Sequence, residues 1–497
     1  MVDTQTKKQT LDMNGKPYSR VLLMITAVAG AFATFLAGTM LATAYPTLMN
    51  HFNISTDTVQ WLSTGFMLIS GVMIPITAWL MNRFNSKWLY IIGMAIFLIG
   101  NICCLCSHTF AMLLGGRLIA AVGVGVTTSL SQSILLYIFP PEKRGIVMGI
   151  NGIAVGLAPA IGPTLSGWVV DNYGWRVIFM IVIVFVTIDL IAAFFFMKKV
   201  MPTADIKLDY LSAVLSILGF GSLLYGVSKA GSLGWGNHEV VITIIVGIIL
   251  IALFCWRQLQ LDEPFLDIRL LSNWHFTLAS IIGAIARVAL VGVELVLPMY
   301  IQIVRGESAF HSGLILLPGA ILMGLMSPIA GSLFDKMGAK KLVISGLIIL
   351  TVGTMNFVAL TPDTPIIEII VLYAVRIVGI SLAFMPVTTA GMNALPTDKI
   401  NHGTAINNTF RQVAGSIGTA IFTTILTNTT NNMKPSTALL HSAPLAYKHQ
   451  MINAALGGYR ASFFAAMLVG LAGVIVALFL QKNAGLVKRN DANKGVK

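Results

Sequence analysis

Long apolar stretches alternate with short polar segments along almost the whole chain. A helix needs about 20 apolar residues to cross the hydrocarbon core of a bilayer. Helices are expected because an open strand in hydrocarbon leaves its backbone groups unpaired. The pattern predicts fourteen spans, near residues 20–46, 59–82, 88–106, 111–137, 146–169, 177–197, 209–228, 239–256, 276–303, 313–333, 341–360, 366–389, 404–427 and 461–481.

The composition supports a membrane protein. Of the 497 residues, 56% are hydrophobic and only 10% are charged, whereas soluble domains carry roughly 25% charged residues. This excludes a soluble globular enzyme and a disordered chain. The sequence contains no G-x-x-x-x-G-K-[ST] phosphate-binding loop, so a gradient must drive any uphill transport. We therefore expect a non-enzymatic membrane protein without a cofactor.

The net charge of +13 is explained by where the basic residues fall. With the N-terminus inside, 22 of the 32 lysines and arginines lie in cytoplasmic segments, six lie outside and four lie within spans. Such an excess marks the cytoplasmic side of a membrane protein. We expect a multi-pass protein of a bacterial plasma membrane with both termini in the cytoplasm, a lipid bilayer around it and no nucleic acid partner.

The chain is internally duplicated. Three pairs of matching features recur at offsets of 253, 259 and 256 residues: Asn82 with Asp335, Arg117 with Arg376, and Asn151 with Asn407. Nearly equal offsets predict two six-helix halves in one orientation, with the seventh and eighth spans inserted between them. The predicted division is 1–200, 201–272 and 273–497. Parallel halves of this kind build one class of secondary transporters, with the substrate site between the halves.

Several motifs, in this order, carry a family resemblance: Val59–Leu68, Asn82–Lys87, Pro141–Gly145, Ala158–Trp168, Gly331–Lys340 and Arg411-Gln412. Together they resemble the major facilitator superfamily, specifically its fourteen-helix drug:proton antiporter family and a lincomycin-exporter-like branch. The resemblance implies an all-α major-facilitator fold and alternating access between the two halves.

The loops after the second and tenth spans are candidate cytoplasmic gates, with the residues Asn82, Arg83, Lys87, Asp335, Lys336 and Lys340. A carboxylate there can accept the N-terminal amides of a neighbouring helix or pair with an arginine across the halves. Asn82 stands where the family usually has aspartate, so the first contact should be weaker. The alternative is that the basic residues only fix the topology.

The fifth span contains the antiporter motif of the resemblance, with Pro159, Gly162, Pro163 and Gly167. Small residues let helices approach closely, and prolines bend the segment. The resemblance implies helix packing that favours export. An ordinary kinked helix explains the same residues.

Six charges lie within predicted spans: Arg117, Asp189, Arg287, Glu294, Arg376 and Arg411. A charge at mid-helix costs about 2.5–3.5 kcal/mol, so it usually faces protein or water. The resemblance places all but Asp189 and Arg411 on helices that line the substrate cavity. The usual acidic position of the first span is Ala37 here, so proton coupling must depend on Glu294 or Asp189. A static ion pair of Glu294, and a peripheral position for Asp189, are the alternatives.

Other positions carry weaker signals. Met40, Tyr45 and Trp61 are candidates for an apolar pocket, although such residues also serve packing or face lipid. The four cysteines lack metal-ligand spacing and are expected to be small buried residues rather than a metal site. The segment Thr427–Tyr459 is polar and predicts a long loop outside the membrane.

Three functional hypotheses follow. The first is a monomeric secondary exporter that exchanges a small amphipathic drug or toxic compound for protons. The second keeps the fold but exports an endogenous lipid, peptide or anionic metabolite. The third, a non-transporting membrane sensor, would need a regulatory domain that the short termini and loops do not provide.

Overall fold

The computed structural model describes residues 11–436 and 441–481, and no strand occurs among them. Fourteen long helices cross the described bundle, and two short helical turns (Leu41–Ala44 and α2) extend the first. The helices are α1 Arg20–Met40, α2 Tyr45–Phe52, α3 Thr56–Arg83, α4 Ser86–Leu105, α5 Phe110–Ile138, α6 Arg144–Tyr173, α7 Arg176–Phe196, α8 Tyr210–Leu233, α9 His238–Gln260, α10 Trp274–Ile303, α11 Ala309–Met337, α12 Ala339–Phe357, α13 Ile366–Asn393, α14 Ile400–Asn432 and α16 Pro444–Ala477.

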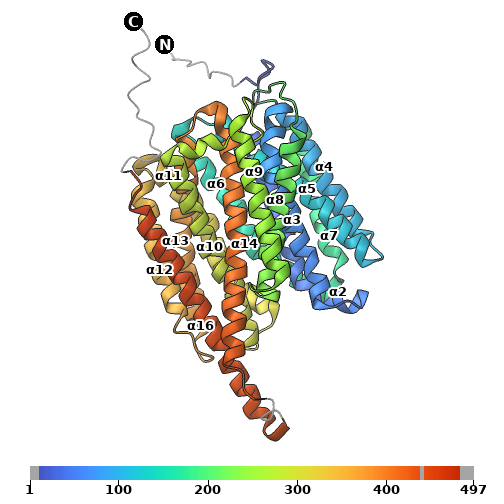
Figure 1. Cartoon of the computed structure of the whole chain (residues 1–497), viewed down its shortest axis with the longest axis vertical. Helices are drawn as coiled ribbons and strands as arrows, with labels where there is room; N and C mark the ends of the chain where they lie inside the picture. Colours follow the sequence, from blue (N-terminus) through green and yellow to red (C-terminus); the bar gives the residue numbers. More distant parts are fainter. Residues whose placement is uncertain (1–10, 437–440, 482–497) are drawn as a thin grey trace, which may run out of the picture.

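Thirteen of these helical segments are long and apolar enough to cross a membrane. The exception is α14, the thirteenth predicted span, whose sequence is too polar to qualify by composition alone. It nevertheless runs the length of the bundle (Figure 1). Helix α1 begins and helix α16 ends at the same end of the bundle, which we call the terminal end.

The expectation of a long loop at 427–459 was wrong. The polar segment 427–459 is largely helical, because α14 continues to Asn432 and α16 already begins at Pro444. Both helices project beyond the other helices, at the bottom of Figure 1. The polar side chains indicate exposure to water, but they do not exclude a helix. The backbone groups of these projecting ends are hydrogen-bonded within the helices. The cysteines also differ from expectation, since only Cys104 is buried and Cys106 is exposed.

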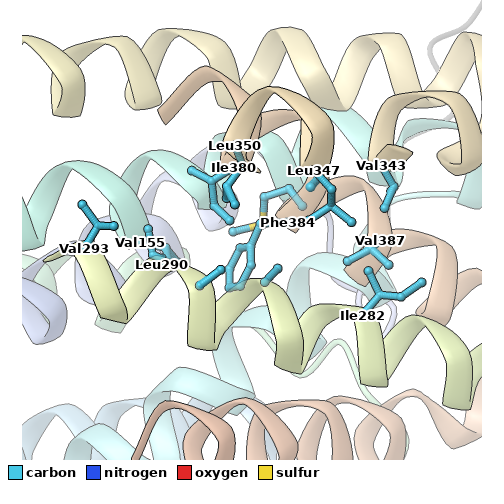
Figure 2. Close-up of a cluster of buried hydrophobic side chains, with 14 of the residues drawn as sticks. Val155, Ile282, Leu290, Val293, Val343, Leu347, Leu350, Ile380, Phe384 and Val387 are labelled. Carbon is cyan, nitrogen blue, oxygen red and sulfur yellow. The ribbon is translucent and has the colours of Figure 1, made fainter. Parts of the chain in front are cut away.

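Each half has its own apolar core. One cluster is built from residues of α1–α7, and the other mainly from α10–α16. Figure 2 shows part of the second core, where side chains of α10, α12 and α13 meet around Phe384. Val155 of α6 joins it from the first half.

Matched glycines hold equivalent helix pairs together in the two halves. A Cβ at Gly93 would lie 2.9 Å from Thr127 Cγ2 of α5, and one at Gly346 would lie 2.6 Å from the Gly379 carbonyl oxygen of α13. In a membrane the hydrophobic effect does not drive helices together, and small residues let them pack closely instead. The offset between these two glycines is 253 residues, as for the loop motifs. The packing therefore repeats the duplication.

The halves meet along two seams of different character. The α6–α11 seam consists of close backbone contacts at Gly145, Gly149 and Gly331. The α3–α14 seam is polar, and the inserted helix α8 packs against both of its members. There the side chain of Leu224 in α8 faces Gly71 of α3.

We expect Gly149→Ala to destabilise the bundle. Its Cβ would collide with the carbonyl oxygen of Ser327 and lie 2.8 Å from Cα of Pro328, and neither backbone can yield cheaply. Overpacking of this kind costs about 1–3 kcal/mol, so the variant should unfold at a lower temperature in detergent. The control is Gly167→Ala on the same helix, whose Cβ meets no atom within 4 Å. Equal unfolding temperatures for the two variants would contradict the close-packed seam.

Candidate functional site

The six charges predicted within spans all lie on long helices, but they divide into two groups. Arg117, Asp189 and Arg376 are at most 4% exposed. Arg287, Glu294 and Arg411 remain partly exposed inside the bundle. Only the second group keeps solvent-accessible surface, so the two groups lie in different surroundings.

Arg117 and Arg376 tie helices together. Arg117 donates from α5 to the carbonyl of Ala37 in α1 at 3.3 Å, and its guanidinium lies 4.1 Å from the Phe66 ring centroid. Arg376 donates from α13 to the carbonyl of Ala289 in α10 and to Thr354 of α12. Each arginine thus reaches the first helix of its own half. Their burial removes them from the group of accessible charges, in contrast to the cavity position that the sequence predicts.

Arg287 lies near both Glu294 and Arg411 without pairing with either. Among the described residues, none of them forms an ion pair or hydrogen bond within the protein. The Arg411 guanidinium lies 4.3 Å from the ring centroid of Phe384. Arg287 reaches α14 beside Gly415, one turn beyond Arg411. The interior of the second half therefore carries more positive than negative charge.

Asp189 lies apart from these charges, in α7 against α1 and α4. Its Oδ2 accepts a hydrogen bond from the Tyr90 hydroxyl at 2.9 Å. Its Oδ1 has no hydrogen-bond partner within the described part of the chain. A buried carboxyl without a cation is unusual at membrane depth.

The three predicted pocket residues separate. Met40 is fully buried, and the Tyr45 hydroxyl donates to Ser63. Trp61 stacks on Tyr225 of the inserted helix α8, with ring centroids 5.8 Å apart. Trp61 thus packs between α3 and the inserted pair rather than with the interior charges, because α8 fills the outer side of that seam.

The antiporter motif lies in α6, which continues unbroken through Pro159 and Pro163. A Cβ at Gly162 would collide with the Thr39 hydroxyl of α1, whereas Gly167 faces open space. Ser166 of the same segment lies 2.6 Å from the Thr43 hydroxyl. The motif therefore includes a close contact between α6 and α1, at Gly162 but not at Gly167.

At the terminal end, Asp335 bridges the halves. Its carboxylate accepts the backbone N–H groups of Gly145 and Ile146, at 2.9 and 3.0 Å, at the start of α6. A helix N-terminus favours negative charge, so this is a charge-assisted contact. Arg144 adds a second cross-half bond, donating to Asn393 at 3.2 Å.

The duplicated counterpart of Asp335 is neutral. The Asn82 side chain lies 2.9 Å from His402 Nε2 and 2.7 Å from the Asn401 amide, at the start of α14. The backbone N–H of Asp267 donates to His402 Nδ1 at 3.2 Å. Asn401 donates its side-chain N–H to the Asn82 oxygen, and the Asn82 amide nitrogen faces His402 Nε2.

The sequence did not identify His402 or Asn401. They lie 256 residues after Ile146 and Gly145, which Asp335 contacts, so the repeat offset is the signal that could have found them. Asp267, in the linker beyond α9, also pairs with Lys399 at 2.7 Å. Burial raises the pKa of the Asp267 carboxyl, but the hydrogen bond and charge of Lys399 outweigh it and hold that pKa below its usual value.

Of the other predicted gate residues, Lys87 and Lys340 bind within their own halves, and Arg83 binds the linker that precedes α8. Arg83 pairs with Asp205, Lys87 donates to the Phe194 carbonyl at 2.7 Å, and Lys340 donates to the Leu478 carbonyl at 2.9 Å. Lys336 is exposed. The gate geometry therefore centres on Asp335 and Asn82.

The terminal end is closed in this conformation. In α14 every residue from Ile400 to Thr409 is buried, whereas the following turn is partly exposed. Asn408 of this buried stretch donates to Ser129 of α5 at 3.1 Å, across the halves. The interior is accordingly sealed on the side of the gate contacts.

Comparisons with known proteins agree with this architecture. The family model of the Major Facilitator Superfamily matches residues 27–419. The MFS-type transporter YcnB of Bacillus subtilis is 44% identical over 94% of this chain and 96% of its own length. The lincomycin resistance protein LmrB of Listeria monocytogenes is 36% identical, covering 94% and 98%. The crystal structure of the human organic anion transporter MFSD10 superposes with a TM-score of 0.63 at 14% identity, covering 92% of this chain and 99% of that one.

We expect Asp335→Asn to loosen the terminal end, because an amide cannot accept two backbone N–H groups as a carboxylate does. Hydrogen bonds to a charged group contribute roughly 1.5–3 kcal/mol, so opening should become at least about tenfold more frequent. In a variant without the 4 native cysteines, a cysteine at buried Ala405 should react correspondingly faster with a thiol reagent. Lys336→Gln, one residue away and exposed, serves as the control. If Asp335→Asn reacts no faster than this control, the contact does not hold the end closed.

Proposed function

Because the chain belongs to the major facilitator superfamily and, within it, to the drug:proton antiporter branch, we propose that it exports amphipathic drugs or toxic compounds in exchange for protons. It works as a monomer in a bacterial plasma membrane by alternating access. The name of its lincomycin-resistance relative supports an exporter of drugs.

The proposed orientation places the terminal end in the cytoplasm. The loops after α3 and α11 lie at that end and carry Arg83, Lys87, Lys336 and Lys340. Excess basic residues mark the cytoplasmic side. In this orientation the closed terminal end is the cytoplasmic one.

The observation that carries the proposal is the state of Glu294. It is an acid within the span α10, partly exposed and without an ion-pair partner among the described residues. Glu294 is 20 residues after the start of α10 and nine before its end, so it lies roughly 14 Å from the outer end of that helix. Such a group can take up a proton from outside.

The exchange follows from electrostatics. With the cytoplasmic end closed, a proton binds Glu294 and removes the one carboxylate among the accessible interior charges. A bound substrate that interacts with that carboxylate is released outside. When the cytoplasmic end opens, the proton leaves and a new substrate binds. The proton and the substrate thus alternate at one place.

We expect Glu294→Gln to abolish substrate-driven proton movement while substrate binding persists, since the amide keeps the size but cannot titrate. Proteoliposomes containing a pH-sensitive dye, to which a drug is added, provide the measurement. Glu263→Gln, in the exposed linker after α9, should behave as the wild type. Undiminished proton movement in Glu294→Gln would remove Glu294 from the mechanism.

The alternative is export of an anionic compound, and one observation favours it. Arg287 and Arg411 donate to no protein group among the described residues. Two nitrogens of Arg117 are fully buried without a hydrogen-bond partner in the described part of the chain, whereas no nitrogen of Arg287 or Arg411 is in that state. They are therefore available to a carboxylate or phosphate. However, protonation of Glu294 would strengthen anion binding beside them, which is opposite to what proton exchange requires. We therefore place the amphipathic drug first and the anionic compound second.

A matched pair of probes separates the two substrates. We expect the methyl ester of an amphipathic acid to bind the purified protein more tightly than the free acid does, because exchange at Glu294 disfavours an anion. Equilibrium binding in detergent measures both. If the acid binds more tightly and Arg411→Gln cancels its advantage, the substrate is an anion.

A further inference from the structure

A second acid lies in the first half, in a setting that Glu294 does not share. Asp189 of α7 is 4% exposed. The Tyr90 hydroxyl of α4 lies 2.9 Å from Asp189 Oδ2 and 3.1 Å from the Thr26 carbonyl oxygen of α1. One hydroxyl therefore stands between a carboxyl group and the backbone of another helix.

Gly30 of α1 makes this arrangement possible. A Cβ at this position would collide with the Tyr90 hydroxyl and lie 2.9 Å from Asp189 Oδ2. The absent side chain lets both polar groups lie directly against α1. This close contact joins three helices at one point within the membrane.

Among the described residues, no cation pairs with Asp189. On α1 no titratable residue occurs between Arg20 and Tyr45, and α6 has charged residues only near its ends. On α4, Lys87 lies one turn before Tyr90 and donates to the Phe194 carbonyl at the end of α7. Arg117 of α5 binds α1 at Ala37, two turns beyond Gly30. Tyr90 is accordingly the group that responds to the charge of Asp189.

A tyrosine hydroxyl has a single proton to donate, and here two acceptors lie within reach. When Asp189 is ionised, Tyr90 donates to its carboxylate and leaves the Thr26 carbonyl without that bond. When Asp189 is protonated, its own O–H donates to the Tyr90 oxygen, and the Tyr90 proton turns to Thr26. In both protonation states every hydroxyl proton is hydrogen-bonded. Only when Asp189 is protonated does the Tyr90 hydroxyl bond α4 to α1.

We propose that Tyr90 is a positioning residue that transmits the protonation of Asp189 to α1 by moving its hydrogen bond between Asp189 and Thr26. This rests on the proposed exchange of protons, and it assigns the first half its own proton-dependent contact. α1 also contacts α6 at Gly162, and the turn that follows α1 contacts α6 at Ser166. α6 in turn forms the seam with α11. A change at Thr26 therefore acts on a helix that packs next to the seam between the halves.

The test uses Tyr90→Phe, which keeps the ring and removes only the hydroxyl. We expect the pH at which exchange is half-maximal to rise by about one unit, a tenfold change in proton affinity, because ionised Asp189 loses its hydrogen-bond donor. Drug affinity at fixed pH should stay within about twofold. Tyr210→Phe, at an exposed site at the start of α8, is the control. In an Asp189→Asn background, Tyr90→Phe should cause no further shift.

A second measurement does not depend on transport. The carboxyl infrared band that Asp189→Asn removes is followed during a pH titration in detergent, with a spin label on cysteine at exposed Val21 of α1. Tyr90→Phe should move the midpoint of the band and uncouple the label from pH. If the wild type moves no protons but both changes occur, the exchange proposal fails and the link stands. If the band and label titrate alike in both proteins, the link is overturned.

Discussion

A polar group within the hydrocarbon layer finds no water, so protein must satisfy it or it must line a space between helices. Helix α14 shows the effect of this constraint, because many of its side chains are polar. Its amides bond to three other helices: Asn407 to Ser280 of α10, Asn408 to Ser129 of α5, and Gln412 to the Met67 carbonyl of α3. Such a helix is stable only where other helices surround it, which explains how a segment too polar to qualify as a span by composition alone still crosses the bundle.

The same constraint separates the two seams. Along α6 and α11, glycines bring backbones together, so the contact rests on shape and leaves few polar groups to satisfy. Along α3 and α14, side-chain amides and the His402 ring exchange hydrogen bonds, and these can break and re-form. The duplicated gate differs in the same way, because Asp335 bonds to backbone amides whereas Asn82 bonds to side chains. A duplicated fold thus contains one contact fixed by charge and one fixed by neutral groups.

Much of this architecture could be predicted from the sequence, because span length and duplication are properties of the chain itself. The crossing helices and the two halves followed from apolar runs and repeat offsets, whereas the family followed from the resemblance that the motifs carry. Trp61 could not be placed, since its partner Tyr225 is more than 160 residues away in the inserted helix α8. The burial of Arg117 and Arg376 could not be predicted either. A sequence shows that a charge lies within a span, but not which carbonyl oxygen accepts its hydrogen bond. His402 resembled any polar residue near a helix end until its contact with Asn82 was visible.

The two acids differ in depth as well as in burial, and this bears on how protons could pass. Asp189 is seven residues from the terminal end of α7, roughly 10 Å along its axis. Glu294 lies in the opposite half of the membrane thickness and is partly exposed there. Under the proposed exchange, Glu294 is the acid that would titrate while the terminal end is closed, because it keeps accessible surface and Asp189 does not. Asp189 lies between α7, α4 and α1, away from the contacts between the halves. The two acids therefore differ in depth and in surroundings, and neither is a carboxylate on α1.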